Sequence, residues 1–217
     1  KNYDWSNPTF KDRCGESLNL AVNYLTDVLH TLYLETVPWP MFHHDQGHTG
    51  YSTSKAPNTN QTLWTYTTGG SIWYSSPAVD DGKVYVGSED HKVYCLDAST
   101  GAQIWNYTTG DLVRSSPAVA DGKVYIGSND KNIYCLNATN GTLKWNYTID
   151  STYVVRGPAV AYGKVYAASG VTVYCLNAST GAYIWSYKSG SVHLRSPAVA
   201  DGKVYVGDCY YVHCLNA

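Results

Sequence analysis

The densest group of potential metal ligands in this sequence lies in its first quarter. His43, His44, Asp45 and His48 stand within a few positions of one another. Imidazole and carboxylate groups at such short spacing can converge on a single metal ion. This histidine group is therefore the best candidate in the chain for a metal site.

Other chemistry is not indicated by the sequence. It contains no nucleophile elbow, no phosphate-binding glycine loop and no HExxH motif, so we predict no catalytic residues and expect a protein that is not an enzyme. The 17 acidic and 15 basic residues leave a net charge of −2, and charged residues make up only 15% of the chain. So weak a field disfavours nucleic acid as a ligand. The 21 tyrosines and 7 tryptophans favour β structure, because rings with a polar edge suit half-buried strand surfaces.

A unit of about 40 residues is repeated along the chain. The prolines that anchor its copies are 40, 41 and 39 residues apart, at Pro77, Pro117, Pro158 and Pro197. Within each unit, short runs of β-branched and aromatic residues are separated by Asp-Gly or similar dipeptides, which is typical of β-hairpins. Four antiparallel strands in a repeat of this length make a propeller blade. The predicted fold is all-β, a propeller of four four-stranded blades over residues 61–217.

The two ends of the repeated part complement each other. The last unit stops at Ala217 without its tryptophan-bearing fourth strand, and an isolated segment of that type, residues 61–67 around Trp64, precedes the first unit. We expect this segment to pair with the strand that carries Cys214, so that it closes the fourth blade within one chain. The alternative is that two chains exchange the segment, which would build an eight-bladed ring or an open chain of subunits.

The repeats resemble a known family. Cys95 to Trp105 and Cys175 to Trp185 share the pattern Cys-Leu-Asp/Asn-Ala-Ser-Thr-Gly-x-x-x-Trp, which is similar to the tryptophan-docking repeats of PQQ-like, or quinoprotein-type, β-propellers. Residues 39–50 resemble the segment ahead of such repeats in prokaryotic, notably archaeal, cell-surface proteins. The resemblance covers residues 38–217 and implies the propeller fold. It does not decide function, because this fold carries quinone enzymes, assembly scaffolds and adhesive proteins alike.

The resemblance also bears on cofactors. Quinoprotein dehydrogenases of this family hold PQQ over the centre of an eight-bladed ring with a calcium ion, an acidic base and two adjacent cysteines. No two of the six cysteines here are adjacent, so no cofactor is expected, and a quinone-dependent enzyme is the least favoured interpretation. For the histidine group, the resemblance implies hydrogen-bonded packing as the alternative to a bound metal ion. The tryptophans of the units are expected to pack between blades, with ligand stacking as the alternative, at Trp64, Trp105, Trp145 and Trp185.

The cysteines divide into two sets. Those at one position of the third strand lie in different blades, too far apart to form disulfides, and are expected to be small buried thiols: Cys95, Cys135, Cys175 and Cys214. Cys14 and Cys209 fall outside the repeat. We predict that these two form a disulfide between the N-terminal arm and the fourth blade.

A propeller would gather chemistry in the loops of one face. The loops between blades carry Trp73, Tyr74, Arg114, Arg156, His193 and Arg195, and those between second and third strands carry Glu89, Asp90, His91, Asp130, Lys131 and Asp208. Arginines around the axis could bind a carboxylate or an anionic sugar. The alternative is that these are solvated charges of ordinary turns.

Residues 1–37 form a separate N-terminal arm, joined to the propeller by residues 38–60. The arm contains an apolar stripe at helical spacing, Leu18, Val22, Leu25, Leu29 and Leu32, which predicts an amphipathic helix. This helix either packs on its own propeller or joins another subunit in a homo-oligomer or polymer. No apolar run is long enough to predict a membrane span.

Six N-x-Ser/Thr sequons indicate export and glycosylation, at Asn60, Asn106, Asn137, Asn140, Asn146 and Asn177. The sequence therefore favours an extracellular or cell-surface glycoprotein. Its expected role is a non-enzymatic scaffold for self-assembly, as a filament or surface layer, or for adhesion. A propeller that binds a small ligand or glycan is the alternative.

Overall fold

The computed structural model describes residues 40, 41, 45, 58–150, 155–190 and 193–217. The chain divides into two compact units, Lys1–Val37 and Pro38–Ala217, and every described residue belongs to the second. The predicted helix of the N-terminal arm lies outside the described residues, and so do Cys14 and the three histidines of the histidine group. The assembly helix and the disulfide between Cys14 and Cys209 therefore stay predictions.

Three four-stranded antiparallel sheets and one three-stranded sheet make up the repeated part. Blade 1 consists of β1 (Ala78–Asp80), β2 (Lys83–Gly87), β3 (Lys92–Asp97) and β4 (Gln103–Thr108). Blade 2 consists of β5 (Ala118–Ala120), β6 (Lys123–Gly127), β7 (Asn132–Asn137) and β8 (Leu143–Thr148). Blade 3 consists of β9 (Ala159–Ala161), β10 (Lys164–Ser169), β11 (Thr172–Asn177) and β12 (Tyr183–Lys188). Blade 4 consists of β13 (Ala198–Ala200), β14 (Lys203–Gly207) and β15 (Val212–Asn216).

The first hairpin of each blade turns at the dipeptide that the sequence marks. Asp81 and Gly82 both have positive φ, 47° and 67°, and the residues on either side of them are paired across the hairpin. A two-residue turn of this kind matches the right-handed twist of the two strands. The same turn in blade 3 holds Tyr162 at a φ of 52°, a conformation that is costly for a bulky residue. The predicted all-β repeat with tight turns is therefore confirmed.

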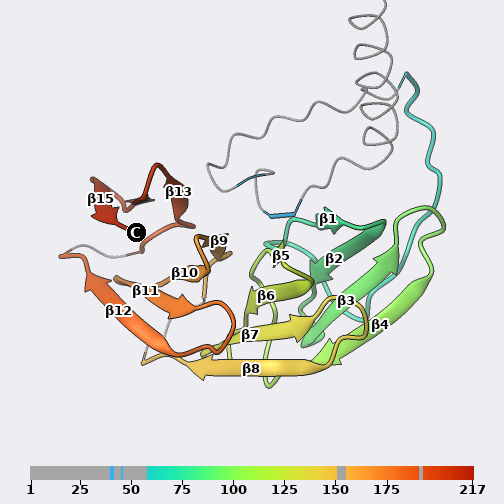
Figure 1. Ribbon diagram of the computed structural model, residues 1–217. Helices are drawn as coiled ribbons and strands as arrows, with labels where there is room; N and C mark the ends of the chain where they lie inside the picture. Colours follow the sequence, from blue (N-terminus) through green and yellow to red (C-terminus); the bar gives the residue numbers. More distant parts are fainter. Residues whose placement is uncertain (1–39, 42–44, 46–57, 151–154, 191–192) are drawn as a thin grey trace, which may run out of the picture. The chain divides into compact units, whose positions relative to one another are not determined.

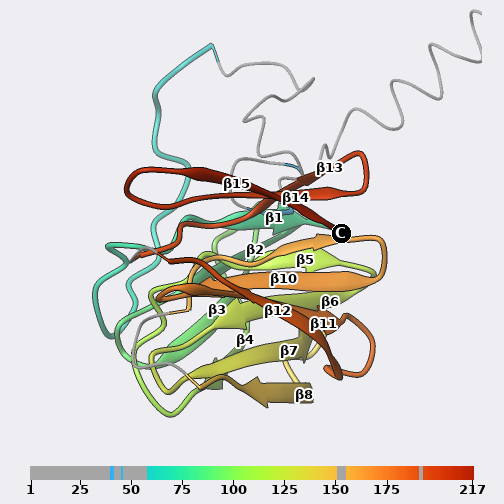
Figure 2. The same ribbon diagram turned by 90° about the vertical axis from the view of Figure 1, so that its left-hand side faces the viewer.

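The blades follow one another in an arc. Their short inner strands contact one another in the order β1, β5, β9 and β13, and Figure 1 shows the four sheets in the same order, from green to red. In the view of Figure 2, β13, β14 and β15 form the uppermost layer. Apolar side chains fill the space between consecutive blades, where Tyr85 of blade 1 packs with Val124 and Leu136 of blade 2.

A repeated tryptophan contact joins the outer strand of one blade to the next blade. The indole Nε1 of Trp145 in β8 donates a hydrogen bond of 3.1 Å to the carbonyl oxygen of Ala178 in blade 3. Gly181 lies against the same indole, so close that a Cβ at this position would stand 2.6 Å from the ring. The glycine of the Ser-Thr-Gly turn is therefore required by the close approach of the ring as well as by its φ of 72°.

The predicted closure of the fourth blade within one chain is wrong. Residues 61–67 form no strand, and blade 4 has three strands with β15 at its edge. Trp64 makes the tryptophan contact with blade 1, where its Nε1 donates to the carbonyl oxygen of Ala98 at 2.9 Å, and the rotation between consecutive blades leaves β15 away from this segment. This contact holds the segment on blade 1, at the opposite end of the arc from β15, as Figure 1 shows.

Candidate functional site

Three arginines from successive loops between blades line one cavity. Each follows a fully buried aliphatic residue, Val113, Val155 or Leu194, which anchors the loop and leaves the next side chain to face the axis. The cavity has a volume of about 250 Å³ and is lined by Tyr74, Arg114, Ser116, Arg156, Gly157, Arg195 and Ser196. We call it the arginine cavity. The structure thus brings together the arginines that the sequence singled out, with Tyr74 in the loop that precedes blade 1.

The charges in the arginine cavity are only partly compensated. The Nε of Arg114 donates to Glu89 Oε1 at 2.7 Å, and its guanidinium lies 5.5 Å from the centre of the Tyr74 ring. Burial, together with the nearby positive charge of Arg195, lowers the pKa of Arg156. Among the ion pairs of the described residues, none includes Arg156 or Arg195. Two neighbouring guanidinium groups that have no carboxylate partner among the described residues favour an anionic ligand.

The acidic residues of the same loops have structural roles. Asp90 accepts hydrogen bonds from the Tyr94 hydroxyl and the backbone N–H of Gly69. Burial alone would raise the pKa of Asp90, but these hydrogen bonds lower it overall. Asp130 accepts equivalent bonds from Tyr134 and Gly110. These carboxylates therefore fix the loops between second and third strands.

The remaining residues predicted for this face are dispersed. Trp73 is 78% exposed and His193 is also exposed, and neither lines the arginine cavity. His91 stands 3.9 Å from Asp111, and Asp208 accepts a hydrogen bond in the β14–β15 turn. Lys131 lies in a turn with a φ of 73°. For the residues of the loops between second and third strands, the geometry fits the alternative of ordinary turn residues better.

The predicted metal site remains untested, because Asp45 is the one member of the histidine group that the structure describes. Within the described residues, no three His, Cys, Asp or Glu side chains are grouped as metal ligands. Asp45 lies beside a second cavity, of about 510 Å³, together with Pro40, Met41 and residues of β5, β9 and β13. Met41 is buried in the cluster between blades 2 and 3. The part of this segment that is described therefore packs on the propeller.

The arginine cavity does not fit the cofactor set of a quinoprotein. Its lining includes no Asp, Glu or Cys residue, so the carboxylate ligands for calcium and the adjacent cysteines are both missing from it. Cys95, Cys135 and Cys175 are buried in three different blades. Burial raises the pKa of the Cys95 thiol to about 12 and that of the Cys175 thiol to about 11. These cysteines are the small buried thiols that the repeat predicts.

Cys214 is the exception, because it is exposed. The same holds for its neighbours on one face of blade 4. Val212 is 79% exposed, whereas Val93, Ile133 and Val173 at the same position of blades 1 to 3 are 0% exposed. Tyr205 is 37% exposed, whereas Tyr125 is fully buried. The prediction of four buried cysteines is therefore wrong for Cys214, because no following blade and no outer strand cover this face within the described chain.

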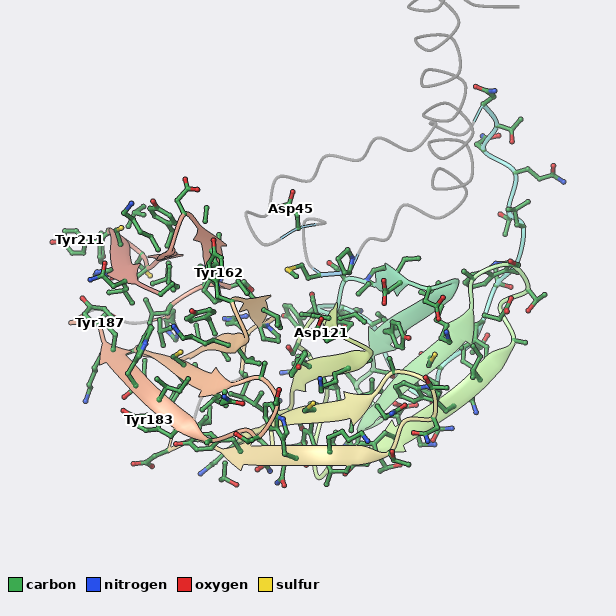
Figure 3. The ribbon with its side chains drawn as sticks, in the orientation of Figure 1. Asp45, Asp121, Tyr162, Tyr183, Tyr187 and Tyr211 are labelled. Atoms are coloured by element: carbon green, nitrogen blue, oxygen red, sulfur yellow. The ribbon has the colours of Figure 1, made fainter. Side chains whose placement is uncertain are left out.

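We call this surface the terminal face of blade 4, made of Ala198, Tyr205, Val212 and Cys214. It continues into the β14–β15 turn with Tyr210 and Tyr211, which are 82% and 65% exposed. Figure 3 shows Tyr211 at this end of the arc, with Tyr187 of β12 on the neighbouring blade. Sequence reasoning missed this face, since it assumed that residues 61–67 would cover it.

The sequons lie where glycans could be attached. Asn60, Asn106, Asn140 and Asn146 are exposed, and Asn137 and Asn177 are half-buried. Asn177 Oδ1 also accepts hydrogen bonds from the backbone N–H groups of Ser179 and Thr180, which closes the turn after β11. Glycosylation stays a prediction. The described residues include no helix that is long and apolar enough to cross a lipid bilayer.

Comparison with solved structures shows which known folds resemble this one. BamB from Moraxella catarrhalis has a TM-score of 0.63 and 24% identity, over 73% of this chain and 53% of that chain. The quinohemoprotein alcohol dehydrogenase ADHIIG from Pseudomonas putida HK5 has a TM-score of 0.69 and 21% identity, over 79% of this chain and 34% of that chain. The computationally designed Ika4 protein has a TM-score of 0.65 and 15% identity, over 73% of this chain and 99% of that chain.

The chain thus spans about half the length of the BamB structure and about a third of the dehydrogenase. Because these identities are below 25%, the likeness shows the fold and no shared activity. No curated protein matches the chain. The sequence model of the family described as outer membrane protein assembly factor BamB matches residues 53–155 and 151–210. The chain therefore belongs to this family of PQQ-like propeller repeats.

Proposed function

We propose that this chain is a non-enzymatic propeller module of a secreted or cell-surface glycoprotein, and that it serves as a scaffold for self-assembly or adhesion. The observation that carries the proposal is the terminal face of blade 4. An unpaired strand edge bordered by exposed apolar side chains is a template for another strand. In blades 1 to 3 the equivalent positions are buried, so the surface has the composition of an interior interface.

Three further observations support the proposal. The family to which the chain belongs is described as an assembly factor, and the arginine cavity lacks the carboxylates and cysteines of a quinone site. The exposed sequons are compatible with an extracellular protein.

The mass of the native particle tests this proposal. Light scattering and electron microscopy of native protein should show particles of more than one chain. Val212→Lys places a charge in the terminal face and should weaken association at least about tenfold, because a lysine cannot be buried unpaired without a large cost. Leu143→Lys is the matched control, since Leu143 is an exposed residue of β8, 44% accessible, far from the ends of the arc. A single-chain particle at high concentration would contradict self-assembly.

A second candidate function is binding of an anionic ligand in the arginine cavity. The specific observation is the pair formed by Arg156 and Arg195, which lie close enough for Arg195 to lower the pKa of Arg156. A carboxylate or an acidic sugar would neutralise both charges and accept hydrogen bonds from the guanidinium groups. Ser116 and Ser196 in the lining could donate to hydroxyl or carboxylate oxygens.

Titration with citrate and with an oligogalacturonate tests the second function. Arg156→Ala should reduce affinity at least about tenfold, because hydrogen bonds to charged groups are worth about 1.5–3 kcal/mol. Lys131→Ala, at an exposed turn outside the cavity, is the control and should leave affinity unchanged. Equal affinity of the parent and Arg156→Ala would show that the cavity does not bind these anions.

A further inference from the structure

Glu89 balances the charge of one arginine of the arginine cavity. Its Oε1 accepts a hydrogen bond of 2.7 Å from Arg114 Nε, and only 19% of its side chain is exposed. At the equivalent position blade 2 has Asn129, which carries no charge. Among the described residues, the positive charge of Arg114 is therefore balanced, whereas those of Arg156 and Arg195 are not.

The other acidic side chains of these loops do not balance the two remaining charges. The aspartates that follow β2 and β6 are hydrogen-bonded to tyrosine hydroxyls, and Asp208 pairs with His213 at 2.9 Å. Asp150 is exposed, and none of the ion pairs of the described residues includes it. Residues 151–154 and 191–192 contain no Asp or Glu. The described loops of this face thus leave two positive charges for a ligand to neutralise.

One side of the arginine cavity is kept open by a glycine. Gly157 stands directly before an anchoring proline, where the other repeats have Ser76, Ser116 and Ser196. Its φ lies outside the left-handed region, so the backbone does not require glycine here. A Cβ at this position would stand 3.2 Å from the carbonyl oxygen of Ser116 and 3.5 Å from Ser196 Oγ, and both serines line the cavity. Gly157 therefore preserves space that a side chain would reduce.

The size of the cavity and its neutral groups limit the ligand further. Its volume of about 250 Å³ lies below the roughly 300–1,000 Å³ of sites for drug-sized molecules. Ser116 is only 6% exposed, and its Oγ accepts a hydrogen bond of 2.9 Å from the backbone N–H of Ser76. This bond fixes the Ser116 oxygen and leaves its O–H able to donate to a ligand. The cavity therefore suits a small molecule that is rich in oxygen acceptors.

We infer that the arginine cavity takes a small dicarboxylate, and that Glu89 sets the number of acidic groups by balancing Arg114. This inference rests on the proposed binding of an anion in the arginine cavity and names the class of that anion. A single carboxylate can bridge both free guanidinium groups, but it leaves one positive charge unbalanced in a partly buried site. Two carboxylates balance both charges. A third would lie near the Glu89 carboxylate without a cation of its own.

Three anions of different charge test this inference on the parent protein. Glutarate carries two carboxylates, glutaramate is the same chain with one carboxylate changed to an amide, and tricarballylate carries three carboxylates. In calorimetric titrations the parent should bind glutarate at least about tenfold more tightly than glutaramate, because hydrogen bonds between charged groups are the stronger ones. It should bind tricarballylate within about threefold of glutarate, because the third carboxylate has no free cation to meet.

Glu89→Gln tests what sets the number of acidic groups. The variant releases a third positive charge and keeps a side-chain oxygen that can accept from Arg114 Nε. Tricarballylate should then bind at least about tenfold more tightly than glutarate. Asp121→Asn is the matched control, since it removes the same charge at an exposed turn outside the cavity, and it should keep the order of affinities of the parent. In Arg195→Ala one unbalanced charge remains, so glutarate and glutaramate should bind within about threefold of each other.

The outcomes separate this inference from the proposed anion binding. Equal affinity of the parent for glutarate and glutaramate would overturn the inference and leave anion binding standing. The same would follow if Glu89→Gln kept the order of affinities of the parent. If the parent bound none of the three anions, both the inference and the proposed anion binding would be overturned. The first comparison uses the parent alone and therefore does not depend on the folding of any variant.

Discussion

The indole Nε1 of Trp105 in β4 donates a hydrogen bond of 3.0 Å to the carbonyl oxygen of Ala138, which lies in the next blade. The contact recurs between blades 2 and 3, where Trp145 donates to the carbonyl oxygen of Ala178, so one repeated interaction joins blade 1 to blade 2 and blade 2 to blade 3. It also explains the position of Trp64, whose segment follows the same rule although it has no sheet. The tryptophan contact is therefore an interaction on which we expect the stability of the arc to depend.

Loss of an interior tryptophan should destabilise the propeller strongly. Trp145→Ala removes a buried indole together with its hydrogen bond to Ala178, and we expect a loss of about 3–5 kcal/mol in the free energy of unfolding. Trp73→Ala changes an exposed indole and should cost about 0.5 kcal/mol or less. Urea unfolding followed by circular dichroism measures both. Similar losses for the two variants would show that the tryptophan contact is not a source of stability.

Substitution of glycine by alanine should destabilise the protein by different amounts in two kinds of turn. A Cβ at Gly141 would stand 2.7 Å from the Trp105 ring, whereas a Cβ at Gly122 has nothing within 4 Å. Both glycines have positive φ, 71° and 66°, so both variants carry a backbone cost of about 1 kcal/mol. Gly141→Ala should lose about 1–3 kcal/mol more, because the ring must move. Thermal unfolding of the two variants decides this, and a smaller loss for Gly141→Ala would contradict the packing described here.

Thiol modification should report on the terminal face. In the Val212→Lys variant, which we expect to be disassembled, iodoacetamide should modify Cys214 at least about tenfold faster than Cys175. The reason is that Cys175 is buried and has a raised pKa, and both properties suppress the reactivity of its thiol. In the parent protein, Cys214 should be protected and Cys175 should be unchanged. Peptide mass spectrometry after timed alkylation gives the rates. Equal labelling of Cys214 in the parent and the variant would place it outside any interface.

The turn between β14 and β15 should weaken in acid. The hydrogen bond with His213, supported by the backbone N–H groups of Tyr210 and Tyr211, lowers the pKa of Asp208 from 3.8 to about 2. A lowered pKa means that the folded state favours the ionised carboxylate, so this contribution is fully present above about pH 4 and is lost as the pH falls towards 2.

Asp208→Asn should therefore be less stable than the parent at pH 6, and the difference in melting temperature should shrink as the pH falls to 2. Melting curves at four or more pH values measure it. Asp111→Asn is the control. Asp111 lies 3.9 Å from His91 and both side chains are exposed to solvent, so the two form only a weak ion pair. A difference between parent and Asp208→Asn that is constant with pH would contradict the role of the carboxylate charge.

The repeat, the blade architecture and the buried thiols could be predicted from the sequence, because each depends on residues that are near one another in the chain. Asp81 and Gly82 specify their own turn, and alternating residues such as Val93 and Cys95 specify the buried face of a strand. The arginines of the arginine cavity were also identified by position, since equivalent loops of successive repeats meet at the axis.

The tertiary structure alone decided how the ends of the arc are arranged. Whether four blades close depends on the small rotation between consecutive blades, which results from all the packing in each interface and which no single residue specifies. Trp64 is equally suited to a closed ring and to an open arc, because its contact with Ala98 is the same in both. Only the summed rotation places β15 at the far end of the arc and leaves Val212 and Cys214 exposed.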